Sequence, residues 1–113
     1  MSGTTVYLYN NFISDLRAPL SASTDAIRAI SLNTNQANST VGLYYNSVYL
    51  NATSSGANFG STALYHYTDG SSTTSVLDLR NNILVNNSTA NGTGSTVSFR
   101  RASNDLDKYK STS

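Results

Sequence analysis

A short motif recurs three times along this chain at nearly constant spacing. Each copy reads Tyr or Arg, then Asn, then Asn or Ser, then two apolar or aromatic residues. The copies are Tyr9–Ile13, Tyr45–Tyr49 and Arg80–Leu84, and their first asparagines, Asn10, Asn46 and Asn81, are 36 and 35 residues apart. A unit of this length cannot bury its own apolar face, so repeats of this kind stack on their neighbours. The spacing therefore predicts three stacked units.

The composition favours strands over helices. Ser, Thr and Asn make up 47 of the 113 residues, Glu is absent, and charged residues reach only 12%. Helical domains use Glu, Lys, Leu and Ala much more heavily. Disorder is excluded because 38% of the chain is hydrophobic, including eight Tyr and three Phe. We therefore expect one all-β domain.

Each unit is predicted to contain three strands, a tight bend and two polar loops. In the middle unit the strands are Gly42–Tyr45, Ser47–Asn51 and Thr62–Thr68, with the bend at Asn46. The strands are rich in β-branched and aromatic residues, and the loops in turn-forming residues. The segment Ser23–Leu32 also fits a short helix, but its isoleucines suit a strand equally well.

The recurring asparagine has a physical role at such a bend. Asn tolerates the left-handed backbone better than other non-glycine residues. If the units coil on top of one another about 4.8 Å apart, the side-chain amides can bond in a column. We therefore predict a structural ladder of Asn10, Asn46 and Asn81. The same alignment stacks Leu8 with Tyr44 and Leu79, and Phe12 with Val48 and Ile83.

These features resemble the right-handed parallel β-helix family, the pectate-lyase-like solenoids, and in particular the repeat segments of secreted bacterial surface proteins. The resemblance rests on Val6–Leu16, Val41–Asn51 and Val76–Ser88, and it extends from Thr5 to about Arg101. It implies a right-handed parallel β-helix of about three coils, an Asn ladder at one bend, and an extracellular or cell-surface location. Because β-helices include lyases, hydrolases, adhesins and inert stalks, the fold does not decide the function.

The chain divides into a predicted three-coil solenoid, residues 1–102, and a charged tail or cap, residues 103–113. Six of the thirteen charged residues lie between Arg100 and Lys110. A solenoid of three coils has two ends with unpaired strand edges, and such edges are templates for further pairing. The expected partner is therefore a second copy, in a closed oligomer or an end-to-end filament, unless Ser103–Lys110 folds over one end.

Catalytic chemistry is not predicted. Polysaccharide lyases and hydrolases of this fold use several carboxylates on one sheet, whereas Asp15, Asp25 and Asp78 each stack on uncharged residues here. His66 is the only histidine, and the chain has no Cys, so no metal site, cofactor or nucleophilic triad is expected. We expect a non-catalytic structural or adhesive segment; a carbohydrate-binding or carbohydrate-active module is the alternative.

Tyrosines could provide a carbohydrate-binding surface, because sugars stack their apolar C–H faces on aromatic rings. The candidates are Tyr9, Tyr45, Tyr49, Tyr65 and Tyr67. Packing between neighbouring coils is the other explanation for the same residues, and it is the one we favour. A polysaccharide is therefore an alternative partner.

Charge and hydropathy disfavour two other classes of partner. The net charge is +1 at pH 7, which gives no field to attract nucleic acid or an anionic membrane. No apolar stretch approaches the roughly 20 residues that span a bilayer, so no membrane insertion is predicted. The first residues, Met1–Thr5, also lack the pattern of a signal peptide.

Overall fold

The computed structural model describes residues 3–68, 74–102 and 109–111. These residues form ten strands in three parallel sheets. Sheet A contains β1 (Thr5–Tyr9), β4 (Thr40–Tyr44), β7 (Val76–Arg80) and β10 (Tyr109–Ser111), in that order. Sheet B contains β2 (Phe12–Ser14), β5 (Ser47–Leu50) and β8 (Ile83–Asn86). Sheet C contains β3 (Ile27–Asn33), β6 (Ser61–Tyr67) and β9 (Thr96–Arg101).

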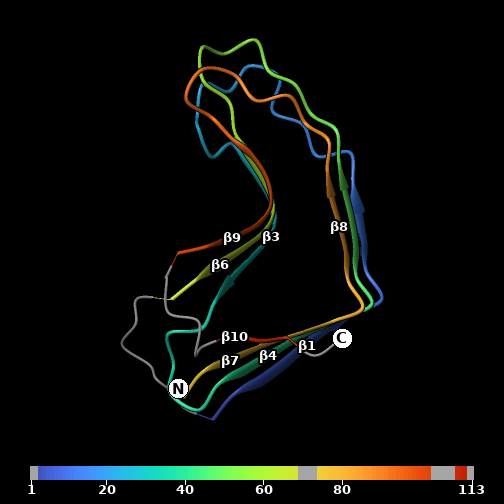
Figure 1. Ribbon diagram of the computed structural model, residues 1–113, viewed down its shortest axis with the longest axis vertical. Helices are drawn as coiled ribbons and strands as arrows, with labels where there is room; N and C mark the ends of the chain where they lie inside the picture. The colour runs from blue at the N-terminus through green and yellow to red at the C-terminus, as the bar shows by residue number, and fades with distance from the viewer. Residues whose placement is uncertain (1–2, 69–73, 103–108, 112–113) are drawn as a thin grey trace.

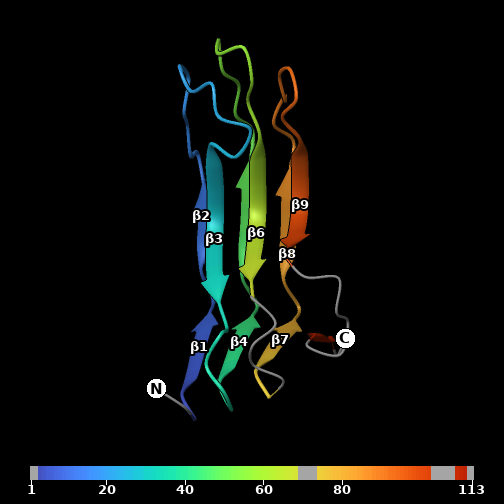
Figure 2. The same cartoon turned by 90° about the vertical axis from the view of Figure 1, so that its left-hand side faces the viewer.

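The chain passes through sheets A, B and C in the same order three times. We call these passages the first coil (β1 to β3), the middle coil (β4 to β6) and the third coil (β7 to β9). Viewed along the stack, the sheets form the sides of one cross-section, with long loops between sheets B and C at its far end (Figure 1). Turned by 90°, the coils lie side by side (Figure 2). The all-β fold with parallel stacked strands agrees with the sequence analysis.

A left-handed backbone residue makes the sharp bend between sheets A and B in every coil. Asn10, Tyr45 and Asn81 occupy this position, with φ angles of 58°, 56° and 53°. Asparagine at two of the three bends matches its tolerance for this conformation. In the middle coil a tyrosine adopts it instead, and Asn46 follows.

The core consists of side-chain columns that run through the three coils. Leu8, Leu43 and Leu79 are in register in sheet A, and Ile13, Val48 and Leu84 are in register in sheet B. The middle members Leu43 and Val48 are 0% and 1% exposed, whereas the outer members are only partly buried. The middle coil is therefore covered from both sides by its neighbours.

The loops between sheets B and C also stack in close contact. Gly60 lies so near the preceding coil that a Cβ atom there would sit 1.9 Å from the carbonyl oxygen of Thr24. Phe59, which is fully buried, exchanges two backbone hydrogen bonds with Asn91 of the next coil, 3.0 and 3.1 Å long. The loops are thus ordered extensions of the coils.

The structure settles several expectations about individual elements. The segment that also suited a short helix contains strand β3, from Ile27, and no helix. None of the described residues forms a helix long and apolar enough to cross a membrane. Of the predicted tail, residues 103–113, the description covers only 109–111, which pair with β7 as the fourth strand of sheet A. The rest of that tail lies outside the described residues.

Candidate functional site

An amide ladder lies just after the bend between sheets A and B. Asn46 is 1% exposed, and its Oδ1 accepts hydrogen bonds from the backbone N–H and the Nδ2 of Asn11, at 3.2 and 2.9 Å. Its own N–H and Nδ2 donate to Oδ1 of Asn82, at 3.0 and 3.1 Å. Nδ2 of Asn46 also donates to the carbonyl oxygen of Leu8, at 3.0 Å. All the hydrogen-bonding groups of this buried amide therefore have partners.

The ladder differs from the one predicted by residue spacing. Asn46 bonds to Asn11 and Asn82, one residue later than the predicted partners Asn10 and Asn81. Asn10 and Asn81 instead occupy the bend position, equivalent to Tyr45. The two outer coils have paired asparagines, and the spacing alone does not say which of the two turns the chain and which enters the stack.

The outer face of sheet A carries a cluster of aromatic and charged side chains. Tyr44 donates its hydroxyl hydrogen to Oδ2 of Asp78, at 3.0 Å, and its ring lies 5.7 Å from that of Tyr7. Arg80 donates to both carboxylate oxygens of Asp78 and lies over the Tyr44 ring at 5.4 Å. Burial, and then the bond to Asp78, raise the pKa of Tyr44 above its ordinary value. Gly42 has no side chain, and the Tyr44 ring lies over the space that a Cβ atom at Gly42 would need.

A polar groove lies on the outside of sheet B, at the end of β2 and β5. It consists of two adjoining pockets of about 250 and 320 Å³ that share Arg17 and Asn51. Its lining residues are Ser14, Asp15, Arg17, Pro19, Tyr49, Asn51, Ala52 and Thr53. We call this set the outer groove. It combines one half-exposed aromatic ring with hydroxyl, amide, carboxylate and guanidinium groups.

The five candidate tyrosines do not share one face. Tyr9 and Tyr45, both 61% exposed, lie at or next to the bend between sheets A and B. Tyr49, 43% exposed, is on sheet B and lines the outer groove. Tyr65 and Tyr67 lie on β6 in sheet C, a different side of the cross-section (Figure 1). The ring of Tyr65 is covered by the guanidinium of Arg28, 3.8 Å from its centroid, so this ring serves packing.

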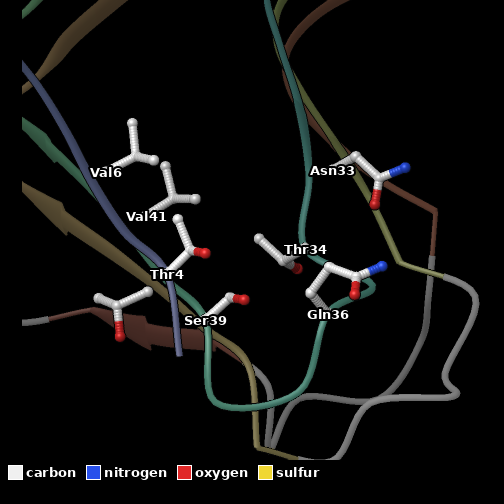
Figure 3. Close-up of a pocket in the computed structure, with 8 residues that line it drawn as sticks. Thr4, Val6, Asn33, Thr34, Gln36, Ser39 and Val41 are labelled. Atoms are coloured by element: carbon white, nitrogen blue, oxygen red, sulfur yellow. The ribbon is translucent and has the colours of Figure 1, made fainter. Parts of the chain in front are cut away.

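A cavity of about 250 Å³ opens at the corner between sheets A and C of the first coil. Val6 and Val41 form its apolar side, and Thr34 and Ser39 point toward each other across it (Figure 3). Thr34 is 2% exposed, and its hydroxyl is 2.7 Å from Nε2 of His66, which is fully buried. Burial lowers the pKa of His66 to about 4. Its neutral ring is therefore an interior packing and hydrogen-bonding group.

Each of the described carboxylates is paired with an arginine of its own coil. Arg17 is 2.6 Å from Asp15, Arg80 is 2.8 Å from Asp78, and Arg28 pairs with Asp25. The hydrogen bond to Asp25 raises the pKa of Arg28, and the bond to Asp78 raises that of Arg80. Within residues 3–68, 74–102 and 109–111, no three His, Cys or acidic side chains come together as metal ligands would.

Three of these features were missed by the sequence analysis. The partners Asn11 and Asn82 were detectable, because Asn11, Asn46 and Asn82 are also about one repeat apart. The outer groove and the cluster around Tyr44 join residues from different strands and loops, and no local motif marks them. Comparison of the chain with protein-family models, curated proteins and solved structures gives no match.

Proposed function

We propose that this chain is a non-catalytic segment of a right-handed parallel β-helix, about three coils long, that serves as a structural or adhesive element of an extracellular or cell-surface protein. The stacked parallel strands and the buried amide ladder support the solenoid part of the proposal. The buried core is a single cluster of apolar side chains drawn from all three coils. This is the arrangement expected of a rigid spacer.

The observation that carries the non-catalytic role is the pairing of the carboxylates. Asp15, Asp25 and Asp78 each contact an arginine two or three residues away in sequence. A general acid and base need two carboxyl groups facing one substrate, with separated pKa values. In each pair a guanidinium donates a hydrogen bond to a carboxylate oxygen, which is the geometry of a charge-assisted ion pair. Structural ion pairs thus account for these carboxylates.

This role is tested by incubating the purified protein with polygalacturonate and other uronic polymers, with and without Ca²⁺. We expect no cleavage products and no change of melting temperature on addition of Ca²⁺. Release of unsaturated oligosaccharides that depends on Ca²⁺ would overturn the proposal. A chelator control separates Ca²⁺ dependence from contamination by a metal-independent enzyme.

A second candidate function, carbohydrate binding, is favoured by the outer groove. Ligand sites combine apolar or aromatic walls with a few polar groups that fix orientation. The ring of Tyr49 can stack on a sugar, while Asn51, Asp15 and Arg17 can donate to or accept from its hydroxyls. The two pockets have volumes of about 250 and 320 Å³, close to the lower end of the range for small-ligand sites.

A glycan array tests this second candidate, with Tyr49→Ala as the variant and Tyr45→Ala as the matched control. Both tyrosines are exposed, but only Tyr49 lines the outer groove. Binding that is lost in Tyr49→Ala and kept in Tyr45→Ala would establish a sugar site there. If the native chain binds no glycan, this function is excluded.

A further inference from the structure

The amide ladder has a direction, and its two ends are complementary. Each inner step runs from the N–H and Nδ2 of one asparagine to Oδ1 of the asparagine in the next coil. Among the described residues, Oδ1 of Asn11 therefore receives no hydrogen bond, and the backbone N–H of Asn82 donates none. Within the part of the chain that the structure describes, the first-coil end thus presents an open acceptor and the third-coil end an open donor.

We propose that the first-coil end is a docking surface for the third-coil end of a second copy of this chain, and that strand β10 must leave β7 before the two ends can join. This inference rests on the proposed structural role and adds to it a partner, an orientation and a regulatory strand. The contact is heterologous, because two different surfaces meet.

The first-coil end has the other features of an incomplete interface. Strands β1, β2 and β3 each have a strand neighbour on one side only within the described residues. Leu8 and Ile13, which point into the stack, are partly exposed, whereas their counterparts Leu43 and Val48 are buried. The cavity beside Val6 opens at the same coil. A further coil would cover this apolar surface, just as the first coil covers the middle one.

The ladder decides which end of the second copy fits. If two first-coil ends met, the unbonded Oδ1 atoms of the two Asn11 side chains would face each other and repel. A third-coil end brings the N–H of Asn82 and its remaining Nδ2 hydrogen toward Oδ1 of Asn11. The new step would repeat the bonding that joins Asn11 to Asn46. Head-to-tail docking is therefore favoured over either symmetric contact.

Strand β10 blocks this contact in sheet A. Its residues pair in parallel with Leu77–Leu79 of β7, on the edge that the next coil of the solenoid would use. The corresponding edges of β8 and β9 have no strand partner among the described residues. A second copy could place its β2 and β3 there, but its β1 would collide with β10. Release of β10 completes the surface.

The test uses the full-length chain with Tyr109→Pro and Lys110→Pro together. Neighbouring residues of a strand direct their N–H groups to opposite sides, so one of the two prolines removes a bond to β7. In sedimentation velocity, we expect the native chain to remain a monomer and the double variant to associate as its concentration rises. A double variant that melts cooperatively but stays monomeric at high micromolar concentration would overturn the proposal.

Two further variants identify the surface used, each added to the double variant. Leu8→Glu places a charge on the first-coil end, where docking would bury it, and should abolish association. Tyr9→Glu, on the outer side of the same strand, is the matched control and should leave association intact. If both variants still associate, or if neither does, the assignment of the first-coil end as the docking surface is wrong. If the prolines unfold sheet A, a chain ending at Ala102 replaces them.

The outcome is separable from that of the proposed function. Sedimentation is measured without polysaccharide or Ca²⁺, so a monomeric double variant refutes docking while the non-catalytic role stands. Ca²⁺-dependent cleavage of a polymer would refute the non-catalytic role without changing the sedimentation result.

Discussion

At the scale of single residues, Asn46 joins the three coils more directly than any other described polar side chain. It is buried, it accepts two hydrogen bonds from the first coil, and it donates two to the third. Buried polar groups that lose a partner cost the full desolvation of that group. The residue therefore both stabilises the stack and fixes which coils are neighbours.

Replacing Asn46 by Leu should lower the free energy of unfolding by about 2–4 kcal/mol. The change removes the acceptor shared by the N–H and Nδ2 of Asn11, one of the two donors to Oδ1 of Asn82, and the bond to the carbonyl of Leu8. Denaturant titration followed by circular dichroism measures the loss. An unchanged midpoint with unchanged slope would show that the ladder does not form in solution.

Tyr45 should be replaceable by Asn with a gain in stability. It has φ 56° at a position where the equivalent residues in the other coils are Asn10 and Asn81. A tyrosine in the left-handed region is strained by about 1 kcal/mol relative to a residue that tolerates it. We expect Tyr45→Asn to raise the denaturation midpoint. A fall in the denaturation midpoint, larger than the loss of one exposed ring would cause, would argue against a left-handed bend at this position.

His66 should make stability depend on pH in a defined range. Its folded-state pKa of about 4 lies below the ordinary 6.5, because burial disfavours the charged ring. As pH falls from 6.5 to 4, the unfolded chain takes up a proton that the folded chain does not, so stability decreases. After allowance for screening, the loss is on the order of 2 kcal/mol. The His66→Gln variant should lose this component, whereas an identical pH profile in both proteins would contradict it.

At the scale of elements, the stacked loops require as much close packing as the strands. Gly60→Ala should destabilise the fold by about 2–4 kcal/mol, because its Cβ would meet the backbone of the preceding coil. Gly42→Ala provides the comparison: its new Cβ would meet the side chains of Tyr7 and Tyr44, which can move. The melting temperature should be lowest for Gly60→Ala, intermediate for Gly42→Ala and highest for the native protein. The reverse order would show that the loops do not stack.

The strands and their order follow largely from the sequence, and their exact alignment does not. Predicted strands at Gly42–Tyr45 and Thr62–Thr68 correspond to β4 and β6 within two residues. The predicted columns were wrong only in the middle coil. Leu8 and Leu79 share a column, but with Leu43 in place of Tyr44. Phe12 and Ile83 share a column, but with Ser47 in place of Val48. Repeats of 35 and 36 residues differ by one, and a shift by one residue moves a side chain to the opposite face of a sheet.

The candidate sites were harder to predict than the strands. Tyr49 was singled out, but its neighbours Ser14 and Arg17 belong to another coil and reach it only through the register of β2 with β5. The pairing of Tyr44 with Asp78 likewise depends on Gly42 leaving room between them. Such sites depend on which residues neighbouring coils bring together, and the repeat alone did not fix that alignment.

At the scale of the whole molecule, the coils are unequally protected. The apolar residues that are at most 1% exposed lie mostly in the middle coil, including Leu43, Leu50 and Leu64. In the outer coils Leu77 is also buried, but Leu8, Leu79 and Leu84 are only partly buried. Among the described residues, the ladder ends in these coils with an open acceptor and an open donor. A solenoid of this kind gains stability from each neighbouring coil, which is why its ends favour a partner.

The central claim, three parallel coils in the described register, is tested most directly by engineered disulfides, because the chain has no cysteine. Ser14 and Tyr49 are in register on neighbouring strands, about 4.8 Å apart between Cα atoms, within the range that a disulfide spans. Ser14→Cys with Tyr49→Cys should oxidise to an intramolecular disulfide, detected by mass spectrometry of the digested monomer. Ile13→Cys with Tyr49→Cys should not, since Ile13 packs against the core and Tyr49 is exposed. Equal or faster oxidation of the second pair would contradict the register and, with it, the stacked fold.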